Sequence, residues 1–105
     1  MRHWSSIRST QDFRRVHARG KRMRIPGMTV SAVAGEGPAL AVGLAVRKGA
    51  GSAVVRNRVK RRLRGALDVL GPVGADAVVI QADESILELP FQKLVKTLRA
   101  GMGTA

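Results

Sequence analysis

The feature that most constrains this chain is a stretch from residue 47 to residue 64 that contains eight basic residues and no acidic one. An apolar series with helical spacing runs through this stretch and just beyond it: Val55, Val59, Leu63, Ala66, Leu67 and Leu70. Spacings of three and four residues place these side chains on one face of a helix. Like charges one turn apart destabilise an isolated helix by roughly a few tenths of a kcal/mol per pair, so the apolar face must pack against a core. The sequence therefore predicts an amphipathic, cationic helix.

The polar side of this helix has the chemistry of a phosphate-binding surface. Asn57, Lys60, Arg61 and Arg64 fall together opposite the apolar stripe, and Arg56, Arg58 and Arg62 fall on its flanks. Arginine outnumbers lysine here, which favours bidentate contacts with phosphate. The loop at residues 49–52 precedes the helix, and backbone N–H groups at a helix start also suit phosphate.

The distribution of charge along the whole chain supports a polyanionic partner. The net charge is +12, but residues 1–64 carry sixteen basic and two acidic residues, and residues 65–105 carry three basic and five acidic ones. Such one-sided charge repels itself unless a polyanion neutralises it. A nucleic acid is the usual partner. An anionic membrane surface and a basic surface without any partner are the alternatives.

Length and composition indicate one small domain. A chain of 105 residues suits a single domain over residues 1–105, with residues 1–7 and 101–105 loosely ordered. It has no cysteine, which excludes disulfides and is compatible with a reducing cytoplasm. No stretch approaches the roughly 20 apolar residues of a membrane span. We therefore expect a soluble, cytoplasmic protein that does not bind membranes.

Two further helices are indicated by their boundary residues. Ser9 is a candidate N-cap, Phe13, Val16 and His17 share one face of the helix that follows, and Gly20 is suited to a left-handed stop. Pro90 suits the first turn of a last helix. Phe91, Leu94, Val95 and Leu98 line one face of that helix.

Three segments have strand character. Residues 28–33 and 40–46 flank a turn at residues 35–38, so we expect them to form an antiparallel pair. Residues 77–80 form a short apolar run. The predicted order is approximately α-β-β-α-β-α, which gives an α+β fold, an α/β sandwich of helices on a small mixed sheet.

The segment from Gly51 to Arg61 resembles the Arg-Asn-Arg signature of bacterial ribonuclease P proteins, with Arg56, Asn57 and Arg58 as its centre. Similar supporting motifs occur in the same order over roughly residues 8–100. The resemblance implies an α/β sandwich with a left-handed βαβ crossover, like the second domain of ribosomal protein S5. It also implies a subunit that binds the catalytic RNA and the 5′ leader of precursor tRNA and assists removal of the leader. The RNA subunit would carry out the hydrolysis with Mg²⁺, and most of the Mg²⁺ ligands would belong to the RNA.

The resemblance also assigns roles to individual residues. The RNA-binding residues it implies are Arg47, Lys48, Ser52, Arg56, Asn57, Arg58, Lys60, Arg61 and Arg64. The leader-binding cleft it implies contains Phe13, His17 and Ser31. His17 and Ser31 depart from the family pattern, which usually has aromatic residues there, so fewer bases can be stacked and the leader contacts are expected to be weaker or more polar.

The chain offers no catalytic machinery of its own by sequence. Asp76, Asp83, Glu84 and Glu88 bracket the last strand and are interpreted as solvated charges at loops and helix ends. We predict no catalytic residue and no metal ligand in the chain. The expected spacing of a nucleotide-binding glycine loop is absent, so no nucleotide cofactor is predicted. Trp4 and Phe91 are expected to be packing residues.

Two other functions stay open on the residues alone. A ribosomal or RNA-assembly protein without enzymatic activity would also carry a cationic helix. A protein that binds duplex DNA would do so too. Co-purifying ribosomal RNA would favour the first of these, and a preference for duplex DNA over structured RNA at matched salt would favour the second.

Overall fold

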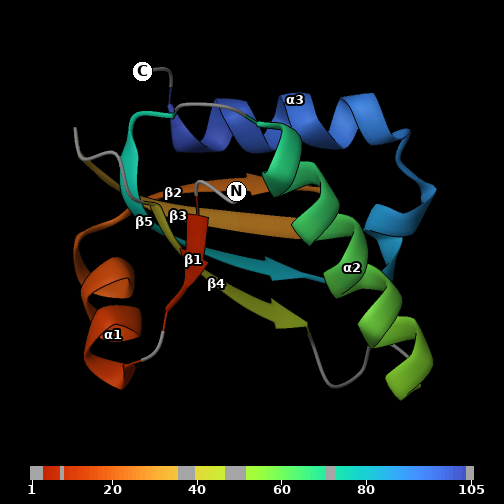
Figure 1. Ribbon diagram of the computed structural model, residues 1–105, viewed down its shortest axis with the longest axis horizontal. Helices are drawn as coiled ribbons and strands as arrows, with labels where there is room; N and C mark the ends of the chain where they lie inside the picture. Colours follow the sequence, from red (N-terminus) through yellow and green to blue (C-terminus); the bar gives the residue numbers. More distant parts are fainter. Residues whose placement is uncertain (1–3, 8, 36–39, 47–51, 71–72, 104–105) are drawn as a thin grey trace.

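The computed structural model describes residues 4–7, 9–35, 40–46, 52–70 and 73–103 (Figure 1). In chain order its elements are β1 (Trp4–Ser6), α1 (Thr10–Arg19), β2 (Lys21–Ile25), β3 (Met28–Ala34), β4 (Leu40–Val46), α2 (Ala53–Val69), β5 (Ala75–Ala82), the short 3₁₀ helix η1 (Glu84–Glu88) and α3 (Phe91–Met102). The predicted α+β fold with helices on a small mixed sheet is confirmed. The predicted order lacked β1, β2 and η1, which are short or rich in exposed charge.

The five strands form one sheet in the order β1-β4-β5-β3-β2. β5 pairs in parallel with β4 and antiparallel with β3. The prediction that β3 and β4 pair with each other was therefore wrong, because β5 lies between them. The reason is visible in β5 itself: its run Ala77, Val78, Val79 and Ile80 is buried throughout. A strand that is apolar on both faces is suited to the middle of a covered sheet.

Helices cover the two faces of the sheet unequally (Figure 1). On one face α2 and α3 enclose the main core, whose fully buried side chains include Val59, Leu63, Leu67, Ile80, Leu94 and Leu98. On the other face α1 packs over a smaller cluster of Val16, Ala77 and Val79. β4, α2 and β5 together form the parallel βαβ unit for which the family resemblance implies a left-handed crossover.

Both ends of the described chain are more ordered than predicted. Trp4 is buried, β1 pairs in parallel with β4, and the Trp4 Nε1–H donates to Oδ1 of Asp68 at 2.8 Å. At the other end α3 continues to Met102, whose side chain is only 2% exposed. The expectation of loose order is corrected for Trp4–Ser6 and for Gly101 and Met102, because large apolar side chains anchor both segments in the core.

The start of α1 agrees with the prediction, and its end does not. Ser9 Oγ accepts a hydrogen bond from the backbone N–H of Asp12 at 3.1 Å, as an N-cap does. Gly20 has φ of −74°, so it is not a left-handed stop. A Cβ at Gly20 would lie 2.5 Å from the carbonyl oxygen of Val16, so space rather than backbone conformation favours glycine there.

Among the helices of the described residues, none is sufficiently long and apolar to cross a membrane.

Candidate RNA-binding site

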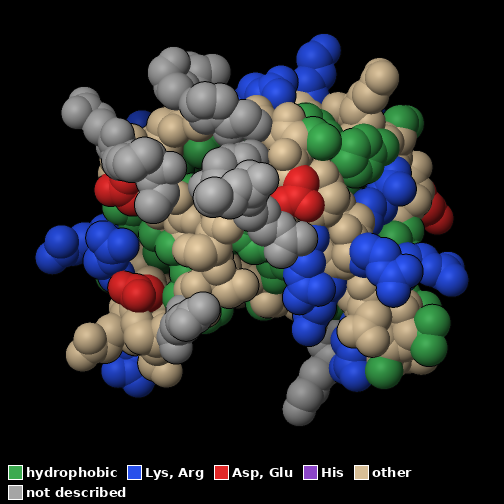
Figure 2. Space-filling model, in the orientation of Figure 1, with side chains coloured by type: hydrophobic (Ala, Val, Ile, Leu, Met, Phe, Trp, Pro, Cys, Tyr) green, Lys and Arg blue, Asp and Glu red, His purple; other side chains and the backbone are tan. Residues whose placement is uncertain are grey.

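The position of α2 is set by its apolar stripe. Val59 and Leu63 are fully buried against the sheet, and Ser52 Oγ accepts a hydrogen bond from the backbone N–H of Val55 at 3.4 Å at the start of the helix. The remaining faces of α2 carry Lys and Arg side chains into solvent (Figure 2). The predicted amphipathic helix is thus present, and the packing of its apolar face directs Arg58, Arg61 and Arg64 outward.

The outer face of α2 is a shallow groove with mixed polar chemistry. Its volume is about 480 Å³, and it is lined by Asn57, Arg61, Arg64, Gly65 and Asp68. The glycine leaves room between the longer side chains. The exposed guanidinium groups of Arg61 and Arg64 lie about one turn apart and can form charge-assisted hydrogen bonds with phosphates.

A second hollow lies between α2 and the N-terminal part of the chain. Its volume is about 170 Å³, and it is lined by Trp4, Ser6, Ile7, Phe13, Val42, Gly43, Leu44, Lys60 and Arg64. Lys60 and Arg64 thus lie beside Phe13, the aromatic side chain that the family resemblance places in the leader cleft. The helix that carries the RNA-binding signature therefore also forms one wall of the candidate leader cleft.

Phe13 depends on a glycine in β4. A Cβ at Gly43 would lie 2.7 Å from two atoms of the Phe13 ring, so the ring rests directly against the backbone of the strand. This contact leaves Phe13 half-buried, with part of the ring facing the hollow. A side chain in this position can pack and stack at the same time.

The two other predicted cleft residues are placed differently. Ser31 is in register with Val79 beneath α1 and is only 4% exposed, which does not favour direct contact with RNA. His17 lies one turn after Phe13 on α1 and is exposed. His17 is accessible to a nucleotide, but neither His17 nor Ser31 lines the hollow beside Phe13.

Arg62 has a structural position. Its Nη2 donates a hydrogen bond to the carbonyl oxygen of Leu89, and its guanidinium carbon lies 5.9 Å from the centre of the Phe91 ring. Arg62 therefore joins α2 to the segment that begins α3. Phe91 packs here at the surface and not in the core, because it is 38% exposed. Its ring lies over the side of α2 near Gly65 instead of against the sheet.

The predicted RNA-binding residues are concentrated on α2. Arg56, Asn57, Arg58, Lys60, Arg61 and Arg64 project from it. Ser52 caps its start, and Arg47 and Lys48 lie outside the described residues. Arg58 and Arg61 are exposed, and Arg56 and Lys60 are partly buried. The sequence did not distinguish the outward cations from those that border the cleft, because that division depends on where β1 and α3 pack.

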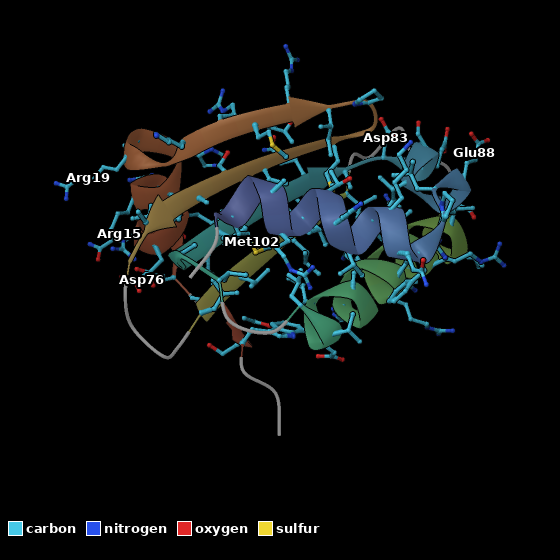
Figure 3. The ribbon with its side chains drawn as sticks, turned by 90° about the horizontal axis from the view of Figure 1, so that it is seen from above. Arg15, Arg19, Asp76, Asp83, Glu88 and Met102 are labelled. Carbon is cyan, nitrogen blue, oxygen red and sulfur yellow. The ribbon has the colours of Figure 1, made fainter. Side chains whose placement is uncertain are left out.

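The carboxylates that flank β5 lie at two opposite ends of the sheet. Asp76 lies at the same end of the sheet as Arg15 and Arg19 of α1 (Figure 3). Asp83 and Glu88 lie at the opposite end. Within the described part of the chain, no three His, Cys, Asp or Glu side chains come together in a way that could hold a metal ion.

Solved structures with the same fold are RNase P proteins. An RNase P protein mutant from Staphylococcus aureus superimposes with a TM-score of 0.74 at 21% identity, covering 91% of this chain and 83% of that one. The RNase P protein of Thermotoga maritima gives a TM-score of 0.74 at 18% identity, covering 92% and 94%. At these identities the likeness establishes the fold.

Sequence comparisons establish the family. Residues 1–105 match the family model described as ribonuclease P. The ribonuclease P protein component of Ruegeria pomeroyi is 37% identical, with 93% of this chain and 83% of that protein covered. That of Paramagnetospirillum magneticum is 35% identical, with 91% and 78% covered. The cationic α2, the cleft beside it and these relatives agree: the chain belongs to the ribonuclease P protein family, whose members are the protein components of the enzyme that processes the 5′ end of tRNA.

Proposed function

We propose that this chain binds the RNA subunit of ribonuclease P through the outer face of α2 and holds the 5′ leader of precursor tRNA in the hollow beside Phe13. The observation that carries the proposal is that Lys60 and Arg64 of α2 line the same hollow as Phe13. One helix therefore borders both surfaces, so a leader lying beside Phe13 would be adjacent to RNA bound along α2.

The described side chains support a role in binding and positioning. Phosphates on α2 neutralise cations that otherwise repel one another, and counterion release contributes to affinity. Phe13 offers a platform for one unpaired base, and base stacking on an aromatic ring contributes about 1–3 kcal/mol. Holding the leader in one geometry lowers the entropic cost of reaching the reactive arrangement.

We further propose that the RNA subunit carries out the hydrolysis and mainly holds the Mg²⁺. When bound, Mg²⁺ supplies an activated water and stabilises the leaving oxygen. The described carboxylates do not form a set of three or more that fits the metal, so we assign them no step.

The cysteine-free composition is compatible with a reducing cytoplasm, and we propose that the protein acts there.

Reconstitution tests the proposed function. The purified chain and its cognate RNA are expected to cleave precursor tRNA at low Mg²⁺ faster than the RNA alone, because the cations of α2 replace part of the charge neutralisation that Mg²⁺ provides. Cleavage is measured in single turnover over a series of Mg²⁺ concentrations. The chain without RNA is the control. Cleavage by the chain alone, or no stimulation of the RNA, contradicts the proposal.

Phe13→Ala is expected to weaken binding of leader-bearing precursor by roughly 5- to 100-fold, while binding of mature tRNA changes little, because only the leader reaches the ring. Binding of both RNAs to the reconstituted holoenzyme gives the comparison. Phe13→Leu is the control for packing against Gly43, since it retains apolar volume without a stacking surface. Equal weakening for precursor and mature tRNA would show that Phe13 acts only through the fold.

A further inference from the structure

A groove between α2 and α3 is separate from the surfaces assigned to RNA. Its volume is about 880 Å³. It is here called the α2–α3 groove and is defined by Val69, Phe91, Lys93, Val95, Lys96 and Arg99. None of these residues lines the outer groove of α2 or the hollow beside Phe13. The proposed function therefore makes no use of this groove.

The floor of the α2–α3 groove is apolar. Among the described residues, three large apolar side chains are exposed, and two of them, Val69 at 56% and Phe91 at 38%, line this groove. Val95, one turn after Phe91 on α3, adds a partly buried side chain. Figure 2 shows apolar side chains gathered at the surface between α2 and α3. A contiguous exposed apolar surface indicates a contact site, whereas a single exposed apolar residue does not.

The rim of the α2–α3 groove is cationic. Lys93, Lys96 and Arg99 follow one another on α3 at intervals of three residues, and all three are exposed. No Asp or Glu is among the described residues that line the groove. The rim therefore complements a partner that carries negative charge.

Two hydrogen bonds from arginine side chains to main-chain carbonyl groups hold the two walls of the groove together. Arg62 of α2 donates to Leu89, just before α3, and its guanidinium carbon lies 5.9 Å from the centre of the Phe91 ring. Toward the other end of α3, Nη2 of Arg99 donates to the carbonyl oxygen of Leu70, just after α2, at 3.1 Å. A groove that is formed before binding lowers the entropic cost of association.

We propose that the α2–α3 groove binds an acidic amphipathic helix of a protein partner. Apolar side chains at helical spacing on that helix contact Val69, Phe91 and Val95, and its Asp and Glu side chains contact the cations of the rim. From Phe91 to Arg99 α3 rises about 12 Å, so the groove takes roughly two turns of the partner helix. RNA bound on α2 and this partner would lie next to each other, because Val69 is on the same helix.

Two other anionic partners fit the groove less well. Of the three floor residues, Phe91 alone has an aromatic face, and Val69 and Val95 offer a nucleotide neither stacking nor hydrogen bonds. A flat membrane surface reaches the cations of the rim but not a floor that lies between two helices. Aliphatic side chains of a protein partner fill this floor and are removed from water there.

Selection from a library of displayed helical peptides tests the proposal. The target is the full-length chain bound to its RNA subunit, so that RNA occupies the cations of α2. The enriched sequences are expected to carry apolar residues three and four positions apart, flanked by Asp and Glu. Enrichment of no sequence, or of sequences without this pattern, would overturn the proposal. The result is separate from the proposed function, because it does not depend on cleavage of precursor tRNA.

Variants of the groove then locate the bound peptide. Val69→Ser is expected to weaken binding of an enriched peptide about 5- to 20-fold, and Lys96→Glu about 10-fold, as measured by fluorescence anisotropy. Both positions are exposed, so neither change removes a buried contact. Val54→Ser is the matched control for the first variant, since Val54 is 67% exposed on α2 and does not line the groove. Arg14→Glu, at an exposed position on α1, is the control for charge reversal.

Both controls are expected to bind the peptide with wild-type affinity. Losses in the controls that equal those in the groove variants would overturn the proposal, as would wild-type affinity in Val69→Ser and Lys96→Glu. Affinity for the RNA subunit and for phosphatidylglycerol vesicles is measured in parallel. A loss of either in Val69→Ser, without a loss of peptide binding, would assign the groove to RNA or to a membrane surface instead.

Discussion

Replacing Arg58 and Arg61 together with alanine is expected to weaken binding of the ribonuclease P RNA by roughly 10- to 100-fold, as two charge-assisted contacts are lost. Both side chains are exposed on α2 and absent from the hollow that contains Phe13. The plot of log affinity against log salt should become shallower by about two, since each phosphate contact contributes about 0.9 to its slope. Filter binding or fluorescence titration at several salt concentrations measures both quantities.

Lys93→Ala combined with Lys96→Ala is the matched control for this variant. It removes the same total charge from exposed positions on α3. If affinity depends on the placement of charge along α2, this control retains most of the affinity and most of the salt dependence. Equal losses in the two double variants would show that net charge alone determines binding, and an unchanged slope in the Arg58 and Arg61 variant would show that the outer face of α2 does not contact phosphate.

Leu63→Ala is expected to lower the free energy of unfolding by about 2–5 kcal/mol, because it leaves a cavity beneath α2 where the wild-type side chain is fully buried. Urea denaturation followed by circular dichroism measures the change. RNA binding should weaken as well at temperatures where the variant is partly unfolded, since the cations of α2 keep their arrangement only while its apolar face is packed.

Val54→Ala is the control for the stability measurement. It lies on the same helix but is 67% exposed, so its free energy of unfolding should change by no more than about 0.5 kcal/mol. A similar loss of stability in both variants would indicate that burial at Leu63 is not what determines the stability of α2.

The sequence was most informative where one pattern had a single structural solution. The apolar stripe of α2 has helical spacing over four turns, and its buried members are the predicted ones, Val59, Leu63, Ala66 and Leu67 among them. Local capping chemistry likewise located the start of α1 at Ser9. Both predictions depend on neighbours in sequence, so no knowledge of the rest of the fold was needed.

Strand pairing was harder to predict from the sequence, because it depends on contacts between distant segments. β3 and β4 are consecutive strands in the sequence, which ordinarily favours a hairpin. β5 separates them since its apolar run can be buried on both faces, and a sequence pattern for one strand does not state which neighbours it will have. β2 was missed for a related reason: it is a short strand at the edge of the sheet, and only Met23 and Ile25 alternate with its exposed cations.

The residues of the site could be predicted from the sequence, but not which of them face the hollow with Phe13 and which face the outer groove of α2. Helical spacing assigned Lys60 and Arg61 to the same polar side, whereas the structure directs Lys60 toward the hollow with Phe13 and Arg61 toward the outer groove. Arg62 fell on a flank by spacing, and its contact with Leu89 depends on the path of the chain before α3. The role of Gly43 could not be predicted from the sequence, because it depends on the packing of the Phe13 ring of α1 against the backbone of β4.

The central place of β5 has a consequence for biosynthesis. Synthesis proceeds from the N-terminus, so β3 and β4 leave the ribosome before the strand that joins them exists. Until residues 75–82 emerge, the nascent chain can form the local β2–β3 hairpin and a nascent α2, but it lacks the surface on which either is buried. Completion of the sheet is therefore a late event, and the cationic helix acquires its fixed orientation only when translation is nearly finished.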